Sequence, residues 1–437
     1  QMATNFDLAI QKREELLELA KAASPASQQN PNSSVLSREV ELENLRQDQA
    51  HVGLVLRHGD SQSHFQQFEK HIAFLKKQIE QGINLEQTRL RLTWATRNLA
   101  VHMQSYGQID KSTTMLHEAL ELRRQMTELY PSVTRYRVDF ASTAIDLAGA
   151  MVGQGQIEQA IRYAEEGIEG FRIVLRELPE ETNYRVDLAL QLHFLGHLYW
   201  DNFRDNLASE VFQESFQLAQ KIRASNPNNA AIEALYPELL WHRALDLSLQ
   251  GDWQAARESI ENYWDAQYGA SNTNRRSAKD PASALELWEY CCLRTGDTHT
   301  IEKIKQLRSQ FPQDQTQPSS DNTSTMAKIQ RLVRSAEASI LAADKALIDQ
   351  QPQEAYRLEQ ESLKQMQEIL GSIRTESQEW KQQPAQWREV WDLTLRNPSF
   401  TSVRAATEQQ RWPRTDWLAW ESIWQEFRSM QTDRPPL

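Results

Sequence analysis

The sequence contains 437 residues, with 48 basic and 60 acidic side chains and a net charge of −12 at pH 7. This acidic balance argues against a general nucleic-acid-binding protein, which needs a positive surface to neutralise phosphates. Glycine and proline, at 14 and 15 residues, each fall below their average shares of about 7% and 5%. An all-β sandwich or barrel needs frequent turns, so the composition excludes that class and predicts long helices.

The N-terminal part is expected to contain a helix over residues 1–23 and a polar linker over residues 24–36. The first three residues lack the basic and apolar regions of a signal peptide and are compatible with the cut end of a longer protein. No stretch is apolar over the ~18 residues that a bilayer span requires. We expect a soluble chain that does not itself insert into a membrane, either cytoplasmic or an extracytoplasmic region of a membrane-anchored protein.

An internal repeat of 48 residues organises residues 37–265. The YRVD sequence at 136–139 recurs at 184–187, and GQI at 107–109 recurs at 155–157. The same spacing defines a turn position in each unit, occupied by Gly59, Gly107, Gly155, Phe203 and Gly251. A small residue follows five positions later in four units: Ser112, Ala160, Ala208 and Ala256. Glycine permits a positive φ at a helix end, and small residues permit close helix contact, so each unit is predicted to be a pair of helices.

The repeat resembles the tetratricopeptide repeat. Leu195-Gly196 and Tyr199 in the predicted first helix, with Ala208 and Phe212 in the second, stand at that motif's spacing, although its usual period is 34 residues. The segment 119–168 more narrowly resembles the long-period repeat arrays attached to bacterial, especially planctomycete-type, serine/threonine kinases. The resemblance covers about residues 40–265. It implies an all-α fold, an α-solenoid of stacked antiparallel hairpins whose concave groove binds a protein or peptide partner.

On this template, first-helix positions line the groove. The candidate partner-binding residues are Arg97, His193, His197, Trp200, Asp201 and Trp241. His193, His197 and Asp201 lie at i, i+4 and i+8 on one helix face, and two imidazoles with a carboxylate can bind zinc. Because the sequence identifies no third strong ligand, a groove for a partner is favoured over half-buried structural side chains and over a metal site. No metal or other cofactor is predicted.

Beyond the array, residues 266–281 are expected to form a loop, residues 282–310 a degenerate helix pair around Gly296, and residues 311–324 a linker. The only cysteines, Cys291 and Cys292, are adjacent, which excludes a disulfide framework. They lie in an apolar stretch with no basic residue before Arg294, so a buried and inert pair is predicted rather than a redox sensor.

A helical hairpin is predicted over residues 325–372, followed by a Trp-rich helical segment over residues 373–437. Four aromatic residues share one face of a C-terminal helix: Trp417, Trp420, Trp424 and Phe427. A cap on the array is the favoured interpretation, because an open solenoid needs one. The alternative is a docking tail for a partner or a second copy. Membrane contact is disfavoured because this helix carries acidic residues and no basic face.

No catalytic motif supports an enzyme. The sequence Arg57-His58-Gly59 matches the short signature of histidine phosphatases, where it follows a buried strand, whereas here it ends a helical segment. Phosphate-binding loops, nucleophile elbows and kinase signatures are absent from the sequence, so a kinase domain would have to precede Gln1. The sequence therefore favours a non-catalytic protein-interaction scaffold. The alternatives are a structural subunit docking through its Trp-rich tail, and a metalloprotein or enzyme using His193, His197 and Asp201.

Overall fold

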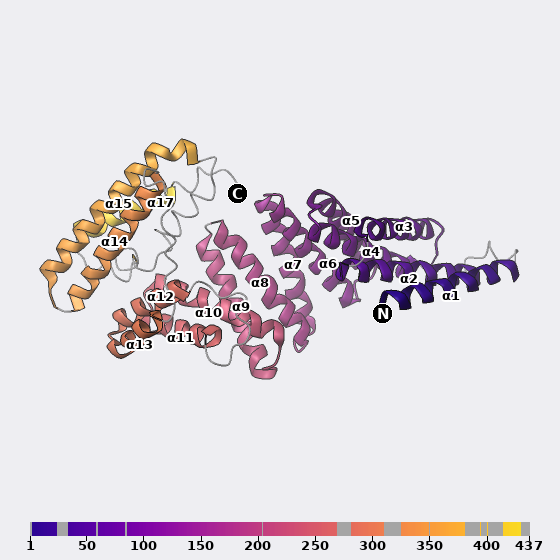
Figure 1. The fold of residues 1–437 in the computed structure, drawn as a ribbon, viewed down its shortest axis with the longest axis horizontal. Coiled ribbons are helices and arrows are strands. Elements are labelled where there is room, and N and C mark those ends of the chain that lie inside the picture. Colours follow the sequence, from indigo (N-terminus) through magenta and orange to yellow (C-terminus); the bar gives the residue numbers. More distant parts are fainter. Residues whose placement is uncertain are drawn as a thin grey trace. The chain divides into compact units, whose positions relative to one another are not determined.

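The computed structural model is all-helical over the residues that it describes (Figure 1). It divides into two compact units. The structure describes residues 2–23, 34–57, 60–83, 85–202, 204–268, 281–309, 325–348, 350–380 and 414–429, together with Thr394 and Phe400. No strand occurs in these ranges. The predicted fold class, an all-α array of stacked helix pairs, is confirmed.

The first unit covers Gln1–Tyr184. Its helices are α1 (Met2–Ala23), α2 (Ser34–Val55), α3 (Ser61–Glu80), α4 (Leu85–Ser105), α5 (Ile109–Leu129), α6 (Thr134–Gly153) and α7 (Ile157–Glu177). Each helix packs against the next along the chain. The first helix of each repeated pair also contacts the first helix of the next pair, α2 with α4 and α4 with α6. This is the stacking that a repeat of helix pairs produces.

The second unit covers Arg185–Leu437. Its helices are α8 (Thr182–Asp201), which begins just before the boundary, α9 (Asp205–Ser225), α10 (Ala230–Gln250), α11 (Trp253–Tyr268), α12 (Pro281–Thr295), α13 (Thr298–Arg308), α14 (Thr325–Ile348), α15 (Pro352–Trp380) and α17 (Arg414–Ser429). Helices α9 to α13 pack consecutively, and α14 and α15 form an antiparallel hairpin that α17 contacts.

The turn positions behave as the repeat predicts. Gly107, Gly155 and Gly251 all have positive φ, between 72° and 82°. After each of them, the next backbone amide donates to a carbonyl five residues earlier, as from Gln108 to Met103 at 2.8 Å. This hydrogen bond closes the helix in a Schellman motif, which a residue with a Cβ adopts less readily. Gly296 ends α12 in the same way, with φ 73°. Gly59 and Phe203 lie outside the described residues.

The packing also repeats with the 48-residue period. Ser112, Ala160, Ala208 and Ala256 are all fully buried, which confirms that the small residue after each turn lies at a helix contact. Two ion pairs occupy equivalent positions, Lys76 with Glu118 at 2.5 Å and Arg124 with Glu166 at 3.0 Å. Both are well exposed, and such surface pairs contribute only about 0–1 kcal/mol each. The buried small residues therefore matter more to the stacking than the charges do.

The two cysteines are buried in α12, as predicted. Burial raises the pKa of each thiol, Cys291 and Cys292, to about 12. Both therefore stay protonated at neutral pH and lack the thiolate that redox chemistry requires. Arg57, from the phosphatase-like triplet, lies in the turn two residues after the end of helix α2 rather than after a strand, while His58 and Gly59 lie outside the described residues.

The aromatic face of α17 covers the α14–α15 hairpin. Trp420 is fully buried and Trp424 is 2% exposed, in one core cluster with side chains of α14 and α15. This placement favours the interpretation of α17 as a cap, and the surface that it covers is the α14–α15 hairpin. Both indoles are buried against the hairpin, which disfavours docking through them, and the docking tail stays a prediction. The side chains of Trp417 and Phe427 lie outside those described.

Candidate functional site

The predicted groove residues fall in both units. Arg97 lies on α4 of the first unit, where its guanidinium forms an ion pair with Asp146 of α6. His193, His197, Trp200 and Asp201 lie on α8, and Trp241 lies on α10, all half-buried and all in the second unit. Whether the two parts serve one partner stays a prediction.

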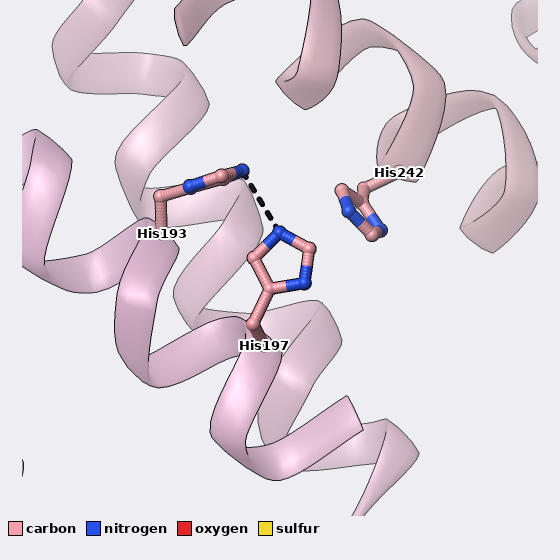
Figure 2. Close-up of side chains that lie close together, drawn as sticks. All are labelled: His193, His197 and His242. Atoms are coloured by element: carbon pink, nitrogen blue, oxygen red, sulfur yellow. Dashed lines mark hydrogen bonds between the residues drawn. The ribbon is translucent and has the colours of Figure 1, made fainter. Parts of the chain in front are cut away.

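Three histidines meet in the second unit (Figure 2). His193 and His197 lie one turn apart on α8, and their Nε2 atoms are 3.2 Å apart. His242 approaches from α10, with its ring centroid 5.0 Å from that of His197 and 6.1 Å from that of His193. One nitrogen from each ring lies within 4.8 Å of the others. We call these three residues the histidine cluster.

Phe212 of α9 forms the apolar wall of the histidine cluster. Its buried ring stacks on His242, with centroids 4.0 Å apart and planes inclined by 12°. The rings of His193 and His197 lie 5.7 Å and 5.5 Å from the same phenyl ring. Phe212 reaches this position because Gly196 of α8 has no side chain: a Cβ there would lie 2.4 Å from the ring.

Helix α10 is held firmly at both ends, which fixes the position of His242. The Asn229 side chain caps its N-terminus by accepting a hydrogen bond from the Ile232 amide at 3.1 Å. Gly251 ends it in the left-handed conformation. Between them the buried side chains of Ile232 and Leu239 anchor the helix. His242 itself is 5% exposed, whereas the two α8 histidines are half-buried.

The sequence did not identify His242, because side chains that face each other across neighbouring first helices are not separated by the 48-residue repeat itself. His193 faces a residue 49 positions later, and so does Arg97, which pairs with Asp146. On the 48-residue spacing, His193 aligns instead with Trp241. The sequence carried one signal for the 49-residue offset, which is that Arg97 and Asp146 have opposite charges at this separation. His242 is thus a third imidazole beside His193 and His197 that the sequence did not identify, and Asp201 is not part of the cluster.

Beside the histidine cluster, the surface has a small depression. Trp200, Phe212, His242, Arg243 and Asp246 are among the residues that line it. Burial raises the pKa of Asp246, while hydrogen bonds from Ser209 and Gln250 oppose that shift. Trp241 directly precedes His242 on α10, and its ring packs on Tyr263, with ring centroids 5.5 Å apart. Trp241 is thus neither a core residue nor fully exposed, and its role as a groove anchor stays a prediction.

A histidine pair in the first unit offers a comparison. His51 of α2 and His102 of α4 are joined by a hydrogen bond between ring nitrogens at 2.9 Å. Burial, reinforced by His51, lowers the pKa of His102 to about 4, so it is neutral at pH 7. Among the described residues, no third histidine, cysteine or carboxylate joins this pair at metal-ligand distance.

Replacing Gly196 with alanine is expected to destabilise the second unit by roughly 1–3 kcal/mol, because the phenyl ring of Phe212 must shift. Gly371 in α15 is the matched control, since an added Cβ there meets no described atom within 4 Å. The same substitution at Gly371 should stabilise the helix by roughly 0.5–1 kcal/mol. Urea denaturation measures both. Equal effects at the two positions would contradict the close contact between α8 and Phe212.

Comparison with known proteins finds only distant structural likenesses. No protein-family model matches the chain, and no curated protein sequence matches it. Among solved structures, BtubC (BKLC) from P. vanneervenii is 16% identical, with a TM-score of 0.38 over 63% of this chain and 97% of that chain. A circular tandem repeat protein with novel repeat topology and enhanced subunit contact surfaces is 14% identical, with a TM-score of 0.29 over 98% and 91%. The TPR domain of P58(IPK) is 12% identical, with a TM-score of 0.23 over 86% and 99%.

These likenesses are too distant to carry a function. The class is defined by the chain's own features, which are the 48-residue repeat, the paired helices and the recurring glycine turns. The chain is a helical-repeat protein. None of its described helices has the long apolar run needed to cross a membrane.

Proposed function

We propose that this chain is a non-catalytic interaction scaffold whose repeats bind a protein or peptide partner. The observation that carries the proposal is a set of half-buried side chains on the first helices of the second unit: His193, His197, Trp200 and Trp241. Aromatic and cationic side chains carry a disproportionate share of interface energy. Half-buried aromatic rings of this kind can bury further area against a partner without first unfolding their own helix.

The finer context of this proposal comes from the sequence resemblance. Segment 119–168 is similar to the repeat arrays of bacterial, planctomycete-type serine/threonine kinases. Helices α5, α6 and α7, which cover this segment, pack consecutively. We propose that the chain is the interaction region of such a larger protein. Sequencing the gene upstream of the codon for Gln1 tests this directly. A kinase domain there supports the context, and an unrelated domain contradicts it.

Replacing Trp241 with alanine is expected to weaken partner binding by at least about 2 kcal/mol, roughly thirtyfold in Kd, if this indole is an anchor. Leu207 of α9 is the matched control, because it is an apolar side chain of the same unit that is 41% exposed. Proteins retained by the wild-type chain and by Leu207→Ala, but lost with Trp241→Ala, are the candidate partners. Titration calorimetry on each then measures the difference in affinity.

The proposal fails if every protein retained by the wild-type chain binds Trp241→Ala as tightly as it binds the wild-type chain. Thermal unfolding of each variant separates a lost contact from a lost fold. Because Trp241 also packs on Tyr263, a conservative Trp241→Phe variant should keep the stability and lose part of the affinity.

A further inference from the structure

We propose that the histidine cluster binds a divalent transition-metal ion of the zinc class. The ligands are one ring nitrogen each from His193, His197 and His242. This inference depends on the geometry of the cluster and not on the proposed partner binding.

The distances suit a single small ion. A tetrahedral zinc ion with Zn–N bonds of about 2.0–2.1 Å holds two ligand nitrogens about 3.3–3.4 Å apart. The Nε2 atoms of His193 and His197 are already 3.2 Å apart. The third nitrogen, from His242, lies within 4.8 Å of both. Closing the site therefore requires the His242 nitrogen to approach the other two, while the pair on α8 is already at ligand spacing.

The ligand chemistry selects the class of ion. All three donors are imidazoles, which suit zinc, copper and nickel, whereas magnesium and calcium prefer oxygen ligands. No carboxylate within the described part of the chain joins the three rings at ligand distance. Three protein ligands leave a fourth tetrahedral position for water or for an added ligand. The cluster therefore resembles an open zinc site more than a closed structural one.

The cluster is also held in place before any ion binds. His193 and His197 share one face of α8, a spacing that brings side chains together on a helix. Phe212 packs against all three rings and forms an apolar wall that limits where they can turn. Without metal, the two Nε2 atoms are at hydrogen-bond distance, 3.2 Å. Coordination through both Nε2 atoms requires each ring to carry its remaining proton on Nδ1, so that both Nε2 lone pairs face the ion.

Coordination would link two elements that are separate in the sequence. Two ligands lie on α8 and the third lies on α10, beyond the whole of α9. An ion that binds only this folded arrangement stabilises it by mass action. Zinc should therefore raise the melting temperature of the chain, and a chelator should reverse that rise.

The test uses the full chain purified without a histidine tag and stripped with chelator. Zinc chloride is titrated by calorimetry, and bound zinc is counted by elemental analysis after gel filtration. We expect one zinc per chain. The half-buried ligands provide variants that should fold, and His193→Ala and His197→Ala should each weaken binding at least tenfold. Cobalt titration should give the visible absorption of a tetrahedral ion.

His51→Ala is the matched control, because it removes one histidine from the two-member pair of the first unit. It should leave zinc stoichiometry and affinity unchanged. His242→Ala tests the third ligand and should abolish the rise in melting temperature with zinc, with circular dichroism confirming that the variant is folded. If His242→Ala is unfolded, His242→Gln is used in its place, because glutamine keeps most of the side-chain volume.

Absence of saturable zinc binding would overturn the proposal. So would zinc binding that survives in both His193→Ala and His197→Ala, or that is lost in His51→Ala. These outcomes are independent of the partner experiment, because Trp241→Ala should bind zinc as the wild-type chain does.

Discussion

Replacing Asp344 with alanine is expected to lower the free energy of unfolding by about 3–5 kcal/mol. The carboxylate of Asp344 accepts hydrogen bonds from Arg294 Nη1 at 3.1 Å and from Tyr290 Oη at 3.0 Å. The side chains of Arg294 and Asp344 are only 8% and 4% exposed. Removing the carboxylate takes the opposite charge from a guanidinium that has almost no access to water. Because Arg294 lies on α12 and Asp344 on α14, the loss also weakens the contact between these helices.

A double variant that lacks both charges separates the effect of an unbalanced charge from the effect of the surrounding packing. Replacing both residues with apolar ones, Arg294→Met with Asp344→Leu, should recover most of the stability, because no buried charge is left unbalanced. The control is Glu354→Ala, whose partner Arg357 is 59% exposed at the side chain. That exposed pair should contribute little to the stability. Urea denaturation measures all four proteins. Equal losses for Asp344→Ala and Glu354→Ala would contradict the burial of the α12–α14 ion pair.

The helix pairs could be predicted because each depends on local signals. A glycine that must take positive φ, as at Gly155, and a small residue five positions later, as at Ala160, mark a turn and a close contact within one unit. Both signals recur every 48 residues, so the period itself locates the helices. No longer-range information is needed to arrive at an all-α repeat fold.

The histidine cluster could be predicted only in part. His193 and His197 are one turn apart on a single helix, and their proximity follows from helical geometry. His242 depends on the register between α8 and α10, which the 48-residue period does not fix. The side chains that face each other are offset by 49 positions, and only a contact such as Arg97 with Asp146 reveals that offset. The partners of Asp344 are likewise set by tertiary packing, since a single charged residue in an amphipathic helix is most often solvated.

The tail shows the same limit. The aromatic spacing of Trp420 and Trp424 predicts an amphipathic helix, but it does not identify the surface that covers the aromatic face. The structure supplies that surface from α14 and α15, together with Phe400, whose ring lies 5.9 Å from that of Trp424. It also supplies a buried acceptor, because the indole nitrogen of Trp420 donates to Glu359, a carboxylate with no solvent exposure.

Replacing Trp420 with alanine is therefore expected to lower the free energy of unfolding by about 3–5 kcal/mol. The indole is fully buried, stacks on Trp424 with centroids 5.7 Å apart, and provides a donor to Glu359. Its removal leaves a cavity among apolar side chains and takes one hydrogen bond from a buried carboxylate, and both effects destabilise. Urea denaturation followed by circular dichroism measures the loss.

Leu418→Ala is the matched control on the same helix, because Leu418 is 52% exposed. It should change the stability by no more than about 0.5 kcal/mol. A docking tail predicts small effects at both positions, since an indole reserved for a partner contributes little to the isolated fold. If Trp420→Ala and Leu418→Ala prove equally stable, α17 does not cap the hairpin. If Trp420→Ala unfolds at lower urea and hydrogen exchange accelerates in α14 and α15 as well as in α17, the three helices form one cooperative core.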